Sequence, residues 1–334
     1  MSTIAKVAEK AGVSPTTVSH VINHADRVSL VLRERVQLAI DELGYVPNRQ
    51  AQSLRTGRTN VIAMLIPDIR NPFFPEMVQA VQLELERNGL DLLVFNTDVP
   101  GGHAQKHGRD YLREIRTRGV DGLIVGDVAL HGMHEELLNL DIPAAFIGYL
   151  SNNAVDSVRF DSFDGAYQMG AYMARKGHRR VAHITGPSFF QEAIVRRDGF
   201  EAGLAANGGQ PTDDLRFEGS YLERSGREAI DWLLKRPAGE MPTAIFFANY
   251  LMALGGLPEL YDRGIRVPGD IAVGVFDDSP QIDFIRPRVT RVGNSPAELA
   301  RRATAMLLER LDKKTAEPPR TEIVPCRLRE FDTA

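Results

Sequence analysis

The amino-acid sequence predicts a small all-α head followed by an α/β body of two lobes. Residues 1–46 contain three short helical patterns separated by turn residues, and residues 47–60 offer almost nothing to bury. From residue 61 onward, strand-sized apolar runs alternate with helical runs. Such an alternation is typical of parallel sheets covered by helices on both faces. Because residues 61–334 make a long chain for one such sheet, we expect two lobes with a cleft between them.

The head has the start and stop signals of three helices. Thr3 is placed to cap a first helix over residues 4–11, and Ser14 is placed to cap a second over residues 15–23. A third pattern follows a serine cap and ends at a glycine, over residues 29–44. The apolar residues are few, so this module has a marginal core of its own.

The stretch AEKAGVSPTTVSHVIN, residues 8–23, is typical of a helix-turn-helix. Ala8, Gly12 and Val18 supply the small residue, the turn and the packing residue that let two helices cross closely. Polar residues at the start and on the outer face of the second helix can then reach base edges. Any helical hairpin can show this pattern, but an N-terminal position and a basic neighbourhood favour DNA.

The stretch PNRQAQSLRTGRTN, residues 47–60, has the composition of a linker, with three arginines and no acidic residue. It can form a short helix, but isolated helices of that length are unstable in water. We therefore expect a hinge helix that becomes ordered when DNA supplies the missing contacts.

In the body, apolar strand-like runs alternate along the sequence with helical runs. Strand-like runs occupy residues 61–67, 90–96, 121–126, 142–148, 180–185, 243–249 and 271–277. Helical runs occupy residues 76–88, 105–118, 163–176, 193–207 and 225–235. We assign the first lobe to about 61–160 and 293–320, and the second to about 161–292 and 321–334.

Charge is unevenly distributed along the chain. Residues 1–60 carry eight lysines and arginines against five acidic residues, a balance of +3, whereas the whole chain carries −4. The body must therefore carry −7. A basic head on an acidic body indicates that only the head meets a polyanion.

Composition excludes several classes of protein. No apolar run approaches the ~20 residues of a membrane helix, and the N-terminus lacks a signal-peptide pattern. The single cysteine, Cys326, excludes an internal disulfide and fits a reducing cytoplasm. The motifs GxSxG and HExxH and a phosphate-binding glycine loop are absent, and the histidines are scattered. We expect no enzyme activity, no metal and no cofactor.

The residues resemble the LacI/GalR (lac-repressor) family of bacterial transcription regulators along the whole chain. The resemblance is carried by TIAKVAEKAGVSPTTVSHVIN, VSLVLRERVQLAIDELGYVPN and AQSLRTGRTN, and by IPDIRNPFF, GVDGLIV, GHRRVAHITGP, RRDGF, LMALGGL, RGIRVPGDIAV and FDD in the family's order. It implies a helix-turn-helix head and a periplasmic-binding-protein-like body of two lobes that binds an effector.

The resemblance implies DNA contacts in the head and the hinge. The matching positions are Thr3, Ser14, Pro15, Thr16, Thr17, Ser19, His20, Asn23, Asn48, Arg49, Gln52, Leu54 and Arg55. His20 stands where the family usually has arginine; histidine makes at best one hydrogen bond to a base where arginine makes two. Leu54 matches a leucine that wedges between base pairs in the minor groove, although it could instead cover an apolar patch.

The resemblance also implies an effector site in the cleft. The matching positions are Phe73, Phe74, Arg196, Tyr221, Asn249, Asp277 and Asn294. A packing role is the alternative for the aromatic residues. Tyr250 replaces the aspartate that usually follows Asn249, and Asn294 stands where a glutamine is common. An arginine and an aspartate facing a cleft suit hydroxyl-rich or anionic ligands.

The expected function is a DNA-binding transcription regulator, a repressor under allosteric control by a small polar effector. The candidates for that effector are a sugar, a sugar acid and a sugar phosphate. We expect a homodimer on double-stranded operator DNA of pseudo-palindromic sequence, because one small head buries too little surface. No heptad pattern follows Arg329, so we expect no tetramer. The alternative is a soluble sugar-binding or sugar-processing protein with an incidental head.

Overall fold

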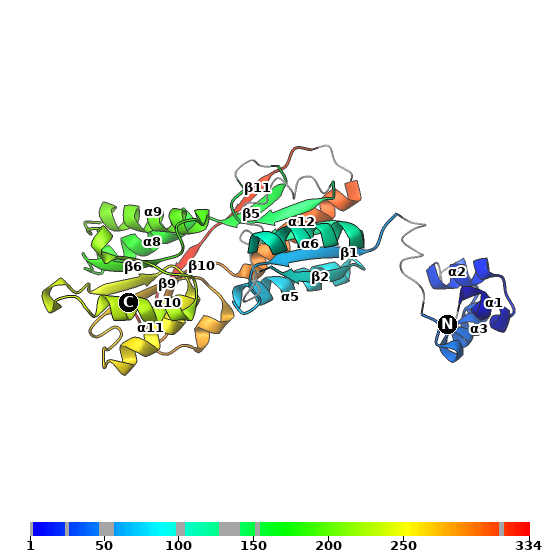
Figure 1. Ribbon diagram of the computed structural model, residues 1–334, viewed down its shortest axis with the longest axis horizontal. Helices are drawn as coiled ribbons and strands as arrows, with labels where there is room; N and C mark the ends of the chain where they lie inside the picture. Colours follow the sequence, from blue (N-terminus) through cyan, green and yellow to red (C-terminus); the bar gives the residue numbers. More distant parts are fainter. Residues whose placement is uncertain are drawn as a thin grey trace. The chain divides into compact units, whose positions relative to one another are not determined.

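The computed structural model divides the chain into two compact units, Met1–Thr59 and Asn60–Ala334 (Figure 1). It describes residues 3–23, 27–46, 57–97, 104–126, 141–150, 154–313 and 317–334. No helix among these residues has both the length and the apolar character that a membrane crossing requires.

The first unit has the three predicted helices with the predicted boundaries. The Thr3 side chain accepts from the Lys6 backbone N–H, and the Ser14 Oγ accepts from the Thr17 N–H at 3.1 Å, so both predicted caps are confirmed. Gly12 ends the first helix in the left-handed conformation, at φ 61°. The helices are α1 (Ile4–Ala11), α2 (Pro15–Asn23) and α3 (Leu30–Leu43).

The head core is small, as its apolar content predicts. Ser29 precedes α3 but makes no side-chain cap, and Gly44 ends that helix in the left-handed conformation. The three helices enclose one cluster of buried side chains. Its members are Val7, Ala8, Ala11, Val18, Val21, Val36 and Ala39.

The first lobe of the second unit is built on a parallel sheet with the order β11-β5-β4-β3-β1-β2. Its apolar strands are buried on both faces, which explains their continuous apolar sequences. The strands are β1 (Val61–Ile66), β2 (Asp91–Asn96), β3 (Gly122–Gly126), β4 (Ala144–Ile147), β5 (Asp156–Phe160) and β11 (Thr321–Val324). The helices are α5 (Phe73–Arg87), α6 (Ala104–Arg118) and α12 (Pro296–Lys313).

The second lobe has a sheet of the same kind, with the order β12-β10-β9-β8-β6-β7. Only β12 runs antiparallel to its neighbour among the strands described. The strands are β6 (Val181–Thr185), β7 (Arg216–Glu218), β8 (Ala244–Phe247), β9 (Ala272–Phe276), β10 (Thr290–Gly293) and β12 (Arg327–Arg329). The helices are α8 (Ser162–Arg175), α9 (Gln191–Ala206), α10 (Glu223–Leu233) and α11 (Tyr250–Asp262), with 3-10 turns at Asp213–Leu215, Ala238–Glu240 and Pro280–Phe284.

Helices cover the two faces of the second sheet in pairs, α8 with α9 and α10 with α11 (Figure 1). The first pair packs backbone against backbone. A Cβ on Gly170 of α8 would lie 2.2 Å from the Phe200 carbonyl of α9, so only glycine fits there. This close contact fixes α9, which carries several residues of the cleft.

The described part of the chain crosses between the two sheets three times. The crossings lie between β5 and α8, between β10 and α12, and between β11 and β12. The boundary predicted at residue 321 is wrong, because β11 pairs with β5 in the first sheet. The crossing lies between Val324 and Arg327 instead.

The predicted strands and helices of the body are all present, with ends that differ by at most three residues. The sequence patterns did not include β5, β7, β10, β11 or β12. These strands are short, and several carry charged residues, as in TEIV and RLR, so they lack the apolar run that marks a buried strand.

Candidate ligand cleft and nucleic-acid-binding face

A cavity of about 450 Å³ lies between the two lobes. Six of the seven predicted effector residues line it, from both lobes: Phe73, Phe74, Arg196, Tyr221, Asn249 and Asp277. Side chains that the sequence did not single out complete the lining, among them Asp68, Arg159, Phe160, Phe189, Phe190 and Glu192.

Arg196 lines the cavity and is held by two hydrogen bonds and one ring contact, while its buried Nε has no partner among the described residues. It lies on α9, and its side chain is 8% exposed. Its Nη1 donates to the Ala248 carbonyl at 2.7 Å, and its Nη2 donates to Glu192 at 2.9 Å. The guanidinium also lies 3.9 Å from the centre of the Phe276 ring, a cation–π contact. Burial opposes its charge, but Glu192 and Asp277 keep the pKa of Arg196 above its usual range.

Glu192 lies one helical turn before Arg196, in the first turn of α9. One oxygen, Oε1, accepts from both Arg196 and the Ser162 hydroxyl. The side chain is 21% exposed and borders the cavity. A carboxylate near the N-terminal end of a helix is also favoured by the helix dipole. Glu192 is thus a positioned carboxylate with one oxygen already engaged.

Asp277 follows β9 directly and faces the same cavity. Its backbone has φ 141°, in the region that favours glycine, so the fold holds this carboxylate in a strained position. Burial raises the pKa of Asp277 to about 6. Arg196 and the Tyr250 N–H, which donates at 2.9 Å, oppose the rise, and Glu192 and Glu76 add to it.

Asn249 and Tyr221 form one structural unit in the cavity wall. The Asn249 Oδ1 caps α11 by accepting from the Met252 N–H at 3.0 Å, and its Nδ2 donates to the Tyr221 carbonyl at 2.9 Å. Tyr221 has φ 63° and lies over Gly186, where a Cβ would come within 2.0 Å of the ring. Asn249 therefore positions the Tyr221 backbone as well as lining the cavity.

Aromatic rings make much of the wall in both lobes. Phe73 stands edge-on to Phe74 at 5.2 Å and to Phe160 at 6.5 Å. In the second lobe, the Phe190 and Tyr221 rings are nearly parallel, at 6.3 Å and 14°. Such rings can cover the apolar faces of a flat or ring-shaped ligand.

Two further charged groups line the first-lobe wall. Asp68 accepts three hydrogen bonds from the Arg70 side chain, and despite burial these bonds lower the pKa of its carboxyl. The Arg159 guanidinium lies 4.4 Å from the centre of the Tyr149 ring and donates to its hydroxyl at 2.9 Å. Burial raises the pKa of Tyr149 to about 12, and Glu192 adds to the rise.

Asn294 does not line the cleft. Its Nδ2 donates to the Pro325 carbonyl at 3.0 Å, which joins two of the crossing segments, and it borders a separate polar pocket of about 270 Å³. The position predicted from the resemblance therefore ties the crossings together. Sequence position alone could not show this, because the direction of a side chain next to a crossing depends on how the lobes meet.

The head presents several predicted DNA-binding residues on its surface. Thr3, Ser14, Pro15, Thr16 and His20 are exposed, and Thr17 and Ser19 are partly exposed. Asn23 is the last residue of α2, and its side chain lies outside the described residues. The predicted hinge residues Asn48, Arg49, Gln52, Leu54 and Arg55 also lie outside them.

Known proteins with this architecture share both units of the chain. Residues 3–48 match the bacterial regulatory proteins of the lacI family, and residues 171–332 match a periplasmic binding protein-like domain. The HTH-type transcriptional repressor PurR of Vibrio atlanticus is 33% identical over 97% of this chain and 96% of its own length. The chain belongs to the LacI family.

Two further LacI-family proteins support this assignment. The ribose operon repressor of Escherichia coli is 32% identical over 97% of this chain and 98% of its own length. A lac repressor dimer bound to operator and the anti-inducer ONPF has a TM-score of 0.86 at 27% identity, covering 99% of this chain and 98% of that one. These LacI-family relatives are repressors, and this chain is a regulator rather than an enzyme.

The sequence patterns do not single out Glu192 as a residue of the cleft. Its signal was present, because it lies four residues before Arg196 in QEAIVRRDGF, the spacing of an ion pair on one helix face. Arg159 and Asp68 had no such signal. They reach the cavity only because strands far apart in the sequence end at the same edge of the sheet.

Proposed function

We propose that this LacI-family protein represses transcription as a homodimer on a pseudo-palindromic operator, and that a small polar effector in the cleft controls its operator affinity. The effector is a sugar, a sugar acid or a sugar phosphate. The observation that carries the proposal is the cavity between the lobes, where Arg196, Asp277 and aromatic rings from both lobes converge.

The exposed side of α2 is the proposed reader of DNA bases. Pro15, Thr16 and His20 lie there, and polar side chains at the start of a recognition helix can enter the major groove. We propose that Leu54 wedges into the minor groove between two hinge segments. Leu54→Ala should then weaken operator binding and reduce DNA bending while leaving effector binding unchanged. Equal bending by the variant and the parent would return Leu54 to a packing role.

The end of the linker is anchored to the first sheet, which gives the cleft a route to the head. The Asn60 N–H donates to the Asp121 carboxylate at 2.9 Å, and the Asn60 carbonyl accepts from the Asp91 N–H at 2.8 Å. Any rotation of the first lobe therefore moves the chain at residue 60. In a dimer, the spacing of two such points would depend on the lobe angle, so effector and operator would bias one equilibrium.

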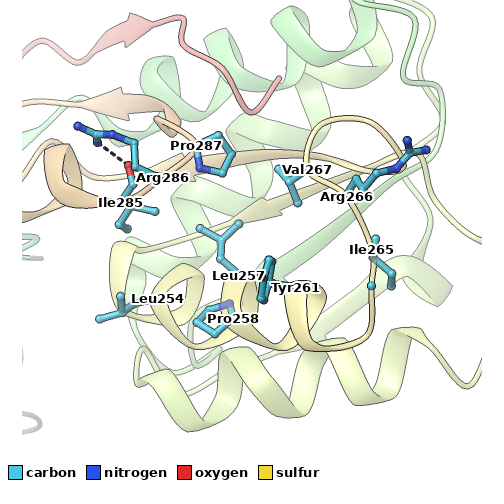
Figure 2. Close-up of a pocket in the computed structure, with 11 residues that line it drawn as sticks. Leu254, Leu257, Pro258, Tyr261, Ile265, Arg266, Val267, Ile285, Arg286 and Pro287 are labelled. Carbon is cyan, nitrogen blue, oxygen red and sulfur yellow. Dashed lines mark hydrogen bonds between the residues drawn. The ribbon is translucent and has the colours of Figure 1, made fainter.

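An apolar groove on the second lobe is a candidate for the dimer interface. The groove has a volume of about 490 Å³ and lies between α11 and the segments around Val267 and Pro287 (Figure 2). Tyr261, which lines the groove, is 82% exposed, and Phe284, which precedes the lining residue Ile285 in the sequence, is 84% exposed. Exposed apolar surface of this kind marks protein interfaces. We propose that a second copy of this chain covers the groove, as befits a relative of the lac repressor dimer.

The deciding experiment is an operator titration with and without effector. A thermal-shift screen of sugars, sugar acids and sugar phosphates identifies the ligand, since a ligand at ~100 times its Kd adds ~2.7 kcal/mol of stability. Operator affinity is then measured across a titration of that ligand. We expect the ligand to change the parent's affinity by ~1–3 kcal/mol, and Arg196→Ala and Asp277→Ala to abolish the change.

Arg197→Ala is the matched control, because Arg197 is the next residue of α9 but pairs with Asp198 and does not line the cavity. It should respond as the parent does. If Arg196→Ala and Asp277→Ala still respond at the parent's ligand concentration, the effector site lies elsewhere. A protein without residues 1–60 that still shifts operator DNA would contradict the DNA-binding part of the proposal.

A further inference from the structure

We propose that Glu192 makes the cleft selective for an uncharged, polyhydroxylated effector and rejects acidic and phosphorylated ones. The inference rests on the function proposed above, because it concerns the same cleft. Of the sugar, the sugar acid and the sugar phosphate proposed above, only the uncharged sugar remains, and Glu192 is the side chain that excludes the other two.

One carboxylate oxygen of Glu192 is available to a ligand in the cavity. Both hydrogen bonds that this carboxylate accepts from described residues, from Arg196 and Ser162, go to Oε1. The second oxygen, Oε2, receives none from the described part of the chain, and the side chain borders the cavity. A carboxylate oxygen can only accept hydrogen bonds, so a ligand that replaces water at Oε2 must bring a donor there. The carboxylate or phosphate dianion group of an acidic ligand brings no donor, so that group cannot occupy the position next to Oε2.

Arg196 is the group that would otherwise attract an anion, but its charge is already countered. One of its nitrogens donates to Glu192 and another to the Ala248 carbonyl, and its face lies on the Phe276 ring. An anionic ligand would have to compete with Glu192 for the same guanidinium, in a buried site where charges are weakly screened. The ion pair that Glu192 forms therefore works directly against an acidic ligand.

The remaining charges do not favour an anion either. Arg159 and Arg196 line the cavity together with Asp68, Glu192 and Asp277. Arg70 neutralises Asp68, and Glu192 neutralises Arg196. Arg159 and Asp277 then remain with opposite charges, so the cavity carries no positive excess that would hold a phosphate.

A hydroxyl group satisfies this arrangement better than any charged group. Guanidinium groups only donate hydrogen bonds and carboxylates only accept them, whereas one hydroxyl does both. A polyol can thus bridge the cationic and anionic side chains of the wall. Its C–H faces would lie against rings such as Phe73 and Tyr221, which line opposite lobes.

The test compares each sugar with its own charged derivatives on the full-length protein. The probes are glucose, galactose, mannose, ribose, arabinose and xylose. Each sugar is compared with two derivatives, one phosphorylated at its terminal CH2OH carbon and one oxidised to a carboxylic acid at that carbon. Isothermal titration calorimetry gives a Kd for each member. We expect the neutral member of at least one set to bind the parent at least tenfold more tightly than both of its charged derivatives.

The test compares two glutamates on the same helix. Glu192→Gln keeps the shape of the side chain and an acceptor for Arg196 but removes the charge, so it should reduce that preference at least tenfold. Glu201→Gln is the control, since Glu201 lies on α9 but pairs with Arg216 and does not line the cavity. It should leave the preference unchanged. Circular dichroism confirms that each variant is folded.

Two results would overturn the inference. One is that no set contains a neutral sugar that binds the parent at least tenfold more tightly than both of its charged derivatives; the other is an unchanged preference in Glu192→Gln. If a charged derivative binds and Arg196→Ala abolishes that binding, the proposed effector site stands and only the selectivity is wrong. If no probe binds, the polyol class is wrong, and the operator titration with the ligand from the screen decides the proposed function separately.

Discussion

At the scale of single residues, two neighbouring aspartates after β9 have opposite roles. Asp277 is partly buried beside the cavity, and this burial raises the pKa of its carboxyl to about 6. Asp278 pairs with Arg291 at 2.8 Å and with Arg329 at 3.1 Å. The Arg291 side chain is 3% exposed, so Asp278 neutralises a buried cation. One carboxylate thus costs stability when it is ionised, and the next one contributes stability.

We predict that Asp277→Asn stabilises the ligand-free protein at pH 7–8 by roughly 1–3 kcal/mol. The folded state binds a proton more tightly at Asp277 than the unfolded chain does, so the parent loses stability as the pH rises from about 4 to 6. Asparagine keeps an acceptor for the Tyr250 N–H and cannot ionise. The gain, measured by urea unfolding, should shrink below pH 6. Asp278→Asn should destabilise the protein at pH 7–8, and a gain in stability from it at that pH would contradict this explanation.

His183 is a buried polar residue whose ring makes no hydrogen bond in the described structure. It lies between the Phe200 ring at 4.7 Å and the Phe246 ring at 5.0 Å, and neither of its ring nitrogens has a hydrogen-bond partner in the described structure. Burial lowers the pKa of His183 to about 3. The imidazole is therefore a neutral, buried group that leaves two polar atoms unsatisfied, which is unfavourable for folding.

We predict that His183→Phe leaves the stability at pH 8 unchanged or raises it by about 1 kcal/mol. In the parent, the unfolded chain gains a proton at His183 near pH 6.5 and the folded chain does not, so stability falls as the pH drops below that value. The variant should lose less stability between pH 7 and pH 5. Calorimetric unfolding across this range measures the difference. A larger acid loss in the variant would show that His183 is protonated in the folded state.

At the scale of elements, the Glu76 side chain links α5 to the second lobe by hydrogen bonds. Glu76 in its first turn accepts from the Ser279 hydroxyl at 3.0 Å, after β9, and from the Ser295 hydroxyl at 2.7 Å, before α12. The same turn of α5 carries Phe73 and Phe74 in the cavity wall. Glu76 therefore joins the residues that line the cleft to a crossing between the lobes.

We predict that Glu76→Ala destabilises the protein by roughly 2–4 kcal/mol, because two hydrogen bonds to a charged acceptor are lost. Glu84→Ala on the same helix should cost about 0–1 kcal/mol, since Glu84 forms an ion pair with a largely exposed Arg87. Urea unfolding of both variants provides the comparison.

Glu76→Gln should also lower the pKa of Asp277, because the negative charge of Glu76 raises that pKa. Equal costs for the two alanine variants would show that Glu76 does not fasten the lobes.

At the scale of the whole molecule, DNA binding would depend on a second copy of the chain. One head has a core of seven buried apolar residues and presents a single short recognition helix. Specific operators are read with more buried surface than one such module provides. If the proposed dimer forms at the groove beside α11, the second lobe affects operator affinity although it is remote in sequence from the head.

We predict that the double variant Tyr261→Asp, Phe284→Asp is monomeric and folded and binds operator at least tenfold more weakly. A charge on each exposed ring would be buried without a partner in the dimer, whereas it stays in water in the monomer. Ile323→Asp is the control, because Ile323 is also exposed but lies on β11, at the edge of the other sheet. Analytical ultracentrifugation and a gel shift measure the two effects. A dimeric double variant would exclude this groove as the interface.

The sequence by itself determined the elements whose signals are local. The caps at Thr3 and Ser14 and the turn at Gly12 predicted the head helices, because each signal is a backbone requirement met by nearby residues. The long apolar runs predicted the central strands, since strands buried on both faces carry apolar residues at every position. Arg196 and Asp277 were predicted because they match family motifs; Arg196 lies on α9 and Asp277 directly follows β9.

Only the tertiary structure decided which lobe each late segment joins and which side chains meet in the cleft. The strand β11 pairs with β5 across more than 150 residues of chain, and its short, partly charged sequence has no local signal for that partner. Asn294 faces the crossings and Arg159 faces the cavity for the same reason. The direction of a side chain in space depends on how distant strands are brought together, which no local pattern records.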